Sequence, residues 1–230
     1  MKKRIALLAA TGILLSVPSL SFGAVIGEVD FENFSNSLIY VNSGSGPVLM
    51  SGTAGQMNPF QAGSYIFALF AAETKTTTID ATLGGGRSLD NGGWDWTGAY
   101  GVNTATPGLM NGNDNTDPGT WIGGWGEGEA ANFAVVGWSA NIGDNLGEAL
   151  AWWNNGNPAA SGTSGYFGIS DIAQDVVVGG GPYPVPTIFG PTAGYEVQGF
   201  TLNYYSVPEP STWAMLVGGF GALLAFRRRR

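Results

Sequence analysis

Strict alternation of apolar and acidic side chains in one early segment constrains the fold most. Residues 24–32 read AVIGEVDFE, which places the acidic residues on one face and the apolar residues on the other. A period of two predicts a strand with one face toward the core and one toward water. Residues 64–72 and 132–140 are apolar on both faces, as is typical of central, covered strands. In residues 195–205 the apolar positions change from odd to even numbers at Gly199, where we expect a β-bulge.

Frequent turn residues between these segments favour many short connections over helical packing. Glycine accounts for 38 of the 230 residues, and only 11% of the residues are charged. Strands separated by Gly, Asn and Pro turns over residues 24–206 predict an antiparallel β-sandwich, which we expect to be jelly-roll-like. If this prediction is correct, four large side chains should be buried: Phe67, Leu69, Val135 and Trp138.

One short helix is predicted after residue 144. Asn145 is a suitable cap, and Glu148 follows three residues later, as in a capping box. Gly156 is a suitable end. Positions i, i+3, i+4 and i+7 give the helix an apolar face. That face consists of Leu146, Ala149, Leu150 and Trp153.

The distribution of charge excludes several classes of function. Seven of the nine basic residues lie near the chain ends, so only Lys75 and Arg87 stand against sixteen acidic residues in 24–206. Such a body repels nucleic acid, and we expect no nucleic-acid partner. The absence of Cys and His excludes thiol nucleophiles, Ser-His-Asp triads and Cys/His zinc sites. We expect Lys75 and Arg87 to form surface ion pairs.

The N-terminal segment has the pattern of a signal peptide. Lys2, Lys3 and Arg4 precede an apolar stretch that Pro18 interrupts, and Ser21-Phe22-Gly23 places small residues before Ala24. A basic start, an apolar segment too short to span a bilayer and a small-residue exit are typical of export signals. We therefore expect residues 1–23 to be removed.

The C-terminal segment combines an apolar helix with a basic end. Residues 212–226 are uncharged, and four arginines follow. The 14 residues 213–226 would form a helix roughly 21 Å long against a bilayer core of about 30 Å, and snorkelling arginines extend its reach. We predict a transmembrane helix with its arginines on the cytoplasmic side. The anchor residues are Trp213, Leu216, Gly218, Ala222, Phe226, Arg227, Arg228, Arg229 and Arg230.

The motif Val207-Pro208-Glu209-Pro210, followed by an apolar helix and a terminal arginine cluster, resembles the PEP-CTERM sorting signal of Gram-negative bacteria. The resemblance covers residues 207–230. It implies that an exosortase, a membrane-embedded processing enzyme, recognises the tail and acts near this motif. It also implies a transient stay in the inner membrane, followed by transfer to the cell surface or extracellular matrix. The two prolines hold the segment extended outside the bilayer, where an enzyme can read it.

Tryptophans in glycine-rich segments are the first candidate binding residues in the body. Exposed indoles on a β protein stack against sugar rings, whereas buried indoles fill a core. We keep both interpretations open, with the core interpretation favoured. The residues concerned are Trp94, Trp96, Trp121 and Trp125.

Oxygen-bearing side chains in NGNDNTD, residues 111–117, suggest a calcium loop, but the EF-hand pattern is not met. An exposed turn is the preferred interpretation, and we expect no metal. Glu127 and Glu129 are conceivable as a hydrolase pair. Two residues apart on a strand, however, they would lie side by side, so we expect solvated charges and no enzyme activity.

Together these patterns predict an exported structural protein of the cell surface or of an exopolysaccharide-containing, biofilm-type matrix. It is processed through its C-terminal signal and needs no cofactor. The alternative is a carbohydrate-binding module that uses exposed tryptophans. A glycan-active hydrolase comes last.

Overall fold

The computed structural model describes residues 26–57, 60–61, 63–79, 89, 92–113, 119–155 and 162–206. Within these ranges the protein is mainly β, with one α-helix, α2 (Leu146–Asn154), and a 3₁₀ turn, η1 (Ala140–Ile142). The strands are β1 (Gly27–Val29), β2 (Tyr40–Asn42), β3 (Pro47–Leu49), β4 (Gln56–Met57), β5 (Phe60–Gln61), β6 (Tyr65–Glu73), β7 (Trp94–Asn103), β8 (Met110–Asn111), β9 (Thr120–Ile122), β10 (Ala130–Ser139), β11 (Gly165–Ile169), β12 (Ala173–Val177) and β13 (Thr201–Tyr205).

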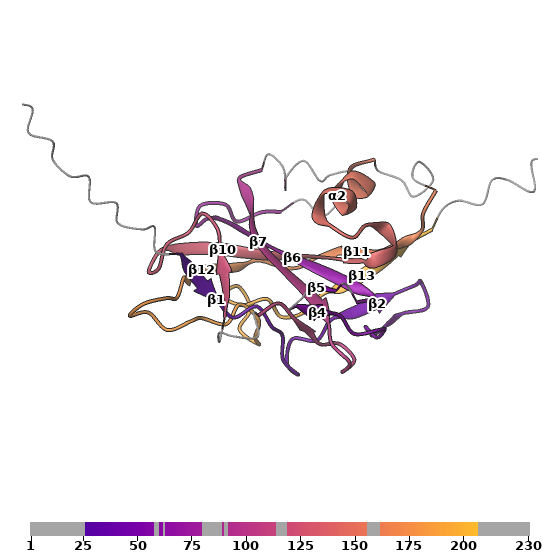
Figure 1. Ribbon diagram of the computed structural model, residues 1–230, viewed down its shortest axis with the longest axis horizontal. Coiled ribbons are helices and arrows are strands. Elements are labelled where there is room, and N and C mark those ends of the chain that lie inside the picture. Colours follow the sequence, from indigo (N-terminus) through magenta and orange to yellow (C-terminus); the bar gives the residue numbers. More distant parts are fainter. Residues whose placement is uncertain are drawn as a thin grey trace, which may run out of the picture.

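The main sheet is mixed and curled. Its strand order is β3-β2-β13-β11-β10-β6-β7-β8, and β12 also pairs with β10. All of its pairs are antiparallel except β13 with β2, which run parallel. Figure 1 shows α2 on one side of this sheet and β1, β4 and β5 on the other. The short pairs β1-β9 and β4-β5 form separate two-stranded sheets in the described part of the chain.

The expected antiparallel sandwich is not confirmed. One face of the main sheet is covered by the helix, and the other by short strands and by the segment 178–200, which makes only isolated bridges. The parallel pairing of β13 with β2 also departs from the predicted all-antiparallel arrangement. Because few residues of the second layer pair regularly, that layer does not become a second extended sheet.

The central pair of strands matches the sequence prediction closely. β6 and β10 pair antiparallel over nine consecutive positions, from Tyr65–Ser139 to Glu73–Ala131. Side chains alternate between the two faces of the sheet, so each strand contributes to two apolar cores. The four residues predicted to be buried, namely Phe67, Leu69, Val135 and Trp138, are all 0% exposed.

The predicted helix is confirmed, together with its cap. The Asn145 side chain accepts a hydrogen bond from the Glu148 amide at 3.0 Å. The Glu148 carboxylate accepts a hydrogen bond from the Asp144 amide. In a standard capping box it would accept from the amide of the cap residue, Asn145, which is one position later. The apolar face packs onto the sheet, and Trp153 stacks on Phe167 with ring centroids 4.0 Å apart.

The predicted bulge at Gly199 is wrong. The backbone of Gly199 has a φ of 98°, and β13 begins only at Thr201. A β-carbon at Gly199 would lie within 2.4 Å of the Leu38 carbonyl oxygen, so only glycine fits this sharp change of direction. The phase change in the sequence therefore marks a turn that precedes the strand.

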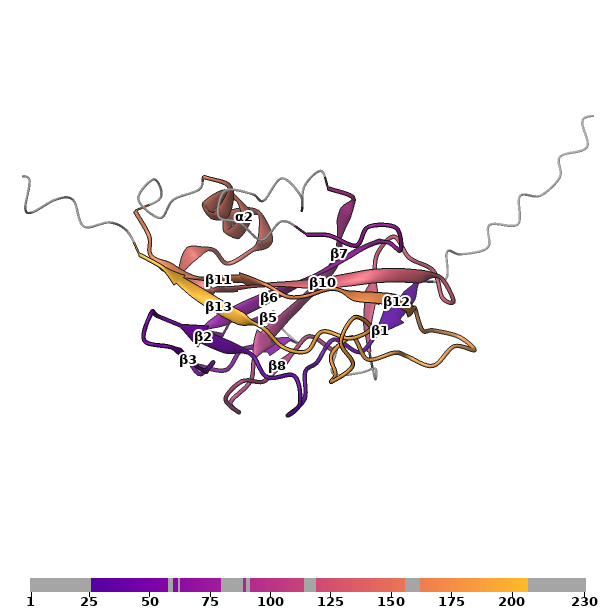
Figure 2. The ribbon, with the colours of Figure 1, turned by 180° about the vertical axis from the view of Figure 1, so that it is seen from behind.

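The two ends of the described chain leave the body at opposite ends of the main sheet. Ile26 leads into β1 at one end, and Ser206 follows β13 at the other, as the two views of Figures 1 and 2 show. Among the residues that the structure describes, no helix is long and apolar enough to cross a membrane. The predicted signal segment 1–23 and the transmembrane helix 212–226 both lie outside those residues.

Candidate functional site

The sorting segment follows directly from the last strand of the sheet. β13 ends at Tyr205, and Ser206 is exposed. The predicted sorting residues Val207, Pro208, Glu209 and Pro210 lie outside the described residues, as do all the anchor residues from Trp213 to Arg230.

The four candidate tryptophans have different surroundings. Trp94 is 3% exposed, and its indole nitrogen donates a hydrogen bond to the Thr78 carbonyl oxygen at 3.1 Å. Trp94 is therefore a core residue, as the favoured interpretation predicted, and it is not a candidate for binding sugar. Trp96 is 44% exposed and contacts Tyr100, whereas Trp121 is 59% exposed. Trp125 is partly buried against the core.

Trp121 and Trp125 are held near the first strand by long-range pairing. β1 pairs antiparallel with β9, and Trp121 lies directly opposite Glu28. The Gly27 amide donates a hydrogen bond to the Trp125 carbonyl oxygen at 2.9 Å. A β-carbon at Gly27 would collide with the Val178 side chain, so glycine permits this close approach. The loop after β9 is thereby fixed beside the start of the described chain.

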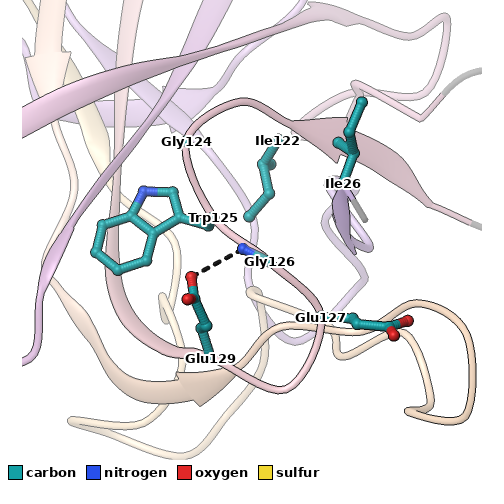
Figure 3. A pocket seen from close by; sticks show the side chains of 7 residues that line it. All are labelled: Ile26, Ile122, Gly124, Trp125, Gly126, Glu127 and Glu129. Atoms are coloured by element: carbon teal, nitrogen blue, oxygen red, sulfur yellow. Dashed lines mark hydrogen bonds between the residues drawn. The ribbon is translucent and has the colours of Figure 1, made fainter. Parts of the chain in front are cut away.

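A surface pocket of about 550 Å³ lies at this junction. This volume is within the usual range for small-molecule sites, roughly 300–1,000 Å³. The lining combines apolar side chains, one indole and two carboxylates (Figure 3). We call it the Trp125 pocket, and its lining residues are Ile26, Ile122, Gly124, Trp125, Gly126, Glu127 and Glu129.

The two carboxylates of the pocket do not face each other. Glu129 accepts a hydrogen bond from the Gly126 amide at 2.8 Å and lies on the Trp125 side of the loop. Glu127 points away from Glu129 in Figure 3, and its Oε2 is buried with no hydrogen-bond partner within the described part of the chain. The two residues occupy a turn instead of the strand that we assumed. This arrangement does not place a substrate between two carboxylates, as glycoside hydrolysis requires.

The Asn-rich loop uses its described side chains to hold the fold. Asn113 accepts a hydrogen bond from the Phe31 amide at 2.7 Å and donates one to the Asp30 carboxylate at 2.6 Å. Asn111 accepts one from the Asn113 amide. Residues 114–118 lie outside the described ranges. In those ranges no group of three or more acidic residues is arranged to hold a metal ion.

Burial raises the pKa of Asp30, although the Asn113 amide and a backbone hydrogen bond at Glu32 act in the opposite direction. Burial and the nearby charge of Asp30 also raise the pKa of Glu32. A carboxyl whose pKa is higher in the folded state binds protons more tightly there, so its ionisation opposes folding. These two groups therefore destabilise the protein as pH rises from about 4 through their folded pKa values.

We expect the free energy of unfolding in urea to be greater at pH 5 than at pH 7. In Asp30→Asn this difference should shrink, because the amide oxygen still accepts from Asn113 and no charge forms. Asp95→Asn, an exposed site on β7, is the matched control and should keep the wild-type difference. An unchanged pH dependence in Asp30→Asn would contradict the role assigned to this carboxyl.

The prediction of surface ion pairs can be checked for one of the two basic residues of the body. Lys75 forms an exposed ion pair with Glu73, as predicted. Such exposed pairs contribute only about 0–1 kcal/mol. Arg87 lies outside the described residues.

Comparison with known proteins identifies a sorting signal in the C-terminal segment. The C-terminal segment marks the chain as an exported protein that is sorted through a membrane-associated C-terminal signal. Specifically, residues 206–230 match the PEP-CTERM protein-sorting motif, the family that the Val-Pro-Glu-Pro segment resembles. This motif is recognised by an exosortase, which makes that enzyme the expected partner. The comparisons found no similar curated protein and no similar solved structure for the chain.

The Trp125 pocket was not predictable from local sequence patterns. Ile26, Ile122 and Glu129 meet only because β1 pairs with β9, about ninety positions apart, a contact that no periodicity reveals. The one local signal was the glycine-rich tryptophan segment at 121–129, which did identify Trp121 and Trp125 as candidates.

Proposed function

We propose that the mature protein is a non-catalytic component of the cell surface or of an extracellular, exopolysaccharide-containing matrix. The match of residues 206–230 to the sorting motif carries this proposal. An acidic, glycine-rich β body supports it, because net charge of one sign keeps an exported protein dispersed. The pocket carboxylates also lack the facing arrangement of a hydrolase.

Fractionation of cells grown as a biofilm tests the location. We expect the processed protein in the cell-surface and matrix fractions, with unprocessed chain in the inner membrane. Recovery of the protein only as soluble periplasmic material would contradict the proposal. A parallel culture that lacks exosortase is the control and should retain the chain in the inner membrane.

Carbohydrate binding is the second proposed function of the body. The specific observation in its favour is that the partly buried Trp125 lines a surface pocket, while Trp121, which is 59% exposed, lies on the preceding strand β9. Indoles with an accessible face bind sugar rings by stacking. Trp96 is also exposed, but it does not line this pocket.

A further inference from the structure

We infer that the Trp125 pocket selects sugars that carry a free amine, and that its preferred polymer is a cationic polysaccharide. This inference rests on the second proposed function, carbohydrate binding, and adds the charge class of the ligand. Among the residues that the structure describes, the pocket lining includes Glu127 and Glu129 but no basic side chain. An ammonium group would therefore enter a favourable field, whereas an acidic sugar would meet repulsion from the lining.

The net negative charge of the whole body also favours a cationic polymer. Lys75 and Arg87 are its only basic residues, and Lys75 is paired with Glu73. The body contains sixteen acidic and two basic residues, an excess of fourteen negative charges. A polymer of uronic acids would be repelled on approach, while a polymer of amino sugars would be attracted.

The pocket also offers two kinds of contact to an ammonium-bearing ring. A cation over the face of an indole is stabilised by the ring quadrupole, and Trp125 lines the pocket on the same side as Glu129. Glu127 adds a second carboxylate to the lining, although its Oε2 is buried beside Gly181. Because Glu127 is only partly exposed, its charge is screened less than that of a fully solvated carboxylate, and it adds to the attraction for an ammonium group.

The pocket lies away from the start of the sorting tail. β1, which follows the pocket residue Ile26, and β13, which precedes the tail, lie at opposite ends of the main sheet (Figures 1 and 2). The pocket is therefore part of the body that we expect to remain after the tail is processed.

Calorimetry with three hexasaccharides on the full chain in mild detergent tests the inference. A β-1,4-glucosamine hexamer is the probe. Its fully N-acetylated form is the matched neutral control, and a galacturonic acid hexamer is the anionic control. We expect the amine form to bind about tenfold more tightly than the acetylated form. We expect no binding of the anionic form, and loss of the preference as salt is raised to about 0.5 M.

Conservative variants test whether the binding occurs in this pocket. Glu127→Gln and Glu129→Gln should each reduce the preference for the amine form, and Trp125→Ala should weaken the binding of both forms. Trp96→Ala and Asp95→Asn, which change exposed residues outside the lining, are the matched controls and should bind as wild type. The two glutamine variants keep the size of the side chain, so the test does not depend on the folding of Trp125→Ala.

Three results would overturn the inference, and they are distinguishable. Equal binding of the amine and acetylated forms would refute the charge preference while leaving carbohydrate binding intact. A preference that persists in both glutamine variants would show general attraction to the acidic body. Failure of every hexamer to bind would refute both the charge preference and the carbohydrate-binding function, without affecting the sorting function.

Discussion

Replacement of Pro208, Glu209 and Pro210 by alanines will stop C-terminal processing and leave the protein in the inner membrane. We expect the predicted signal peptide still to deliver the body across that membrane, so export itself should be unaffected. We expect the predicted apolar helix to halt there with its arginines on the cytoplasmic side, because moving several arginines across a bilayer is costly. Without the two prolines and the glutamate, the exosortase lacks the motif that it recognises. Immunoblots of membrane and surface fractions measure the distribution.

A matched control comes from the same tail. Ser211→Ala with Thr212→Ala changes residues next to the motif and should be processed like the wild type. A triple-alanine variant that still reaches the surface with its normal mature C-terminus would show that the tail is an ordinary anchor.

The second large effect concerns the core. Phe67→Ala should reduce the free energy of unfolding by about 3–5 kcal/mol. Phe67 is 0% exposed, lies opposite Gly137 in the β6-β10 register and contacts Phe200 edge to face with centroids 6.3 Å apart. The glycine leaves room for the ring, so no larger neighbour fills the cavity that alanine would leave. Guanidinium unfolding followed by tryptophan fluorescence measures the change.

An exposed position on the edge strand provides the comparison for this measurement. Val48 is 62% exposed on β3, so Val48→Ala should change the free energy of unfolding by less than about 0.5 kcal/mol. A loss below about 1 kcal/mol in Phe67→Ala would mean that β6 is not the central strand described.

Local patterns predicted the parts of the fold that depend on neighbouring residues. Apolar runs identified β6 and β10, and the Asn145 cap with its apolar face identified α2. The parallel pairing of β2 with β13 was not predictable, because it joins segments about 160 positions apart. The sandwich prediction is not confirmed for the same reason: alternation shows that a strand has a covered face, but not what covers it.

The tryptophans illustrate the same limit at the candidate site. Trp94 and Trp96 lie two residues apart on β7, so alternation gives them the same face of the sheet. Trp94 is covered and donates a hydrogen bond to the Thr78 carbonyl oxygen, whereas Trp96 is exposed. The chain at Thr78 passes beside the Trp94 indole, and that path is a tertiary feature. The sorting tail, in contrast, was recognisable because its motif is contiguous.

Mass spectrometry of the C-terminal peptide, taken from protein in the surface fraction, tests the sorting account most directly. The account predicts a mature chain that ends near residues 207–210 and lacks the arginines at 227–230. Surface protein that retains Arg230 at its C-terminus would contradict it.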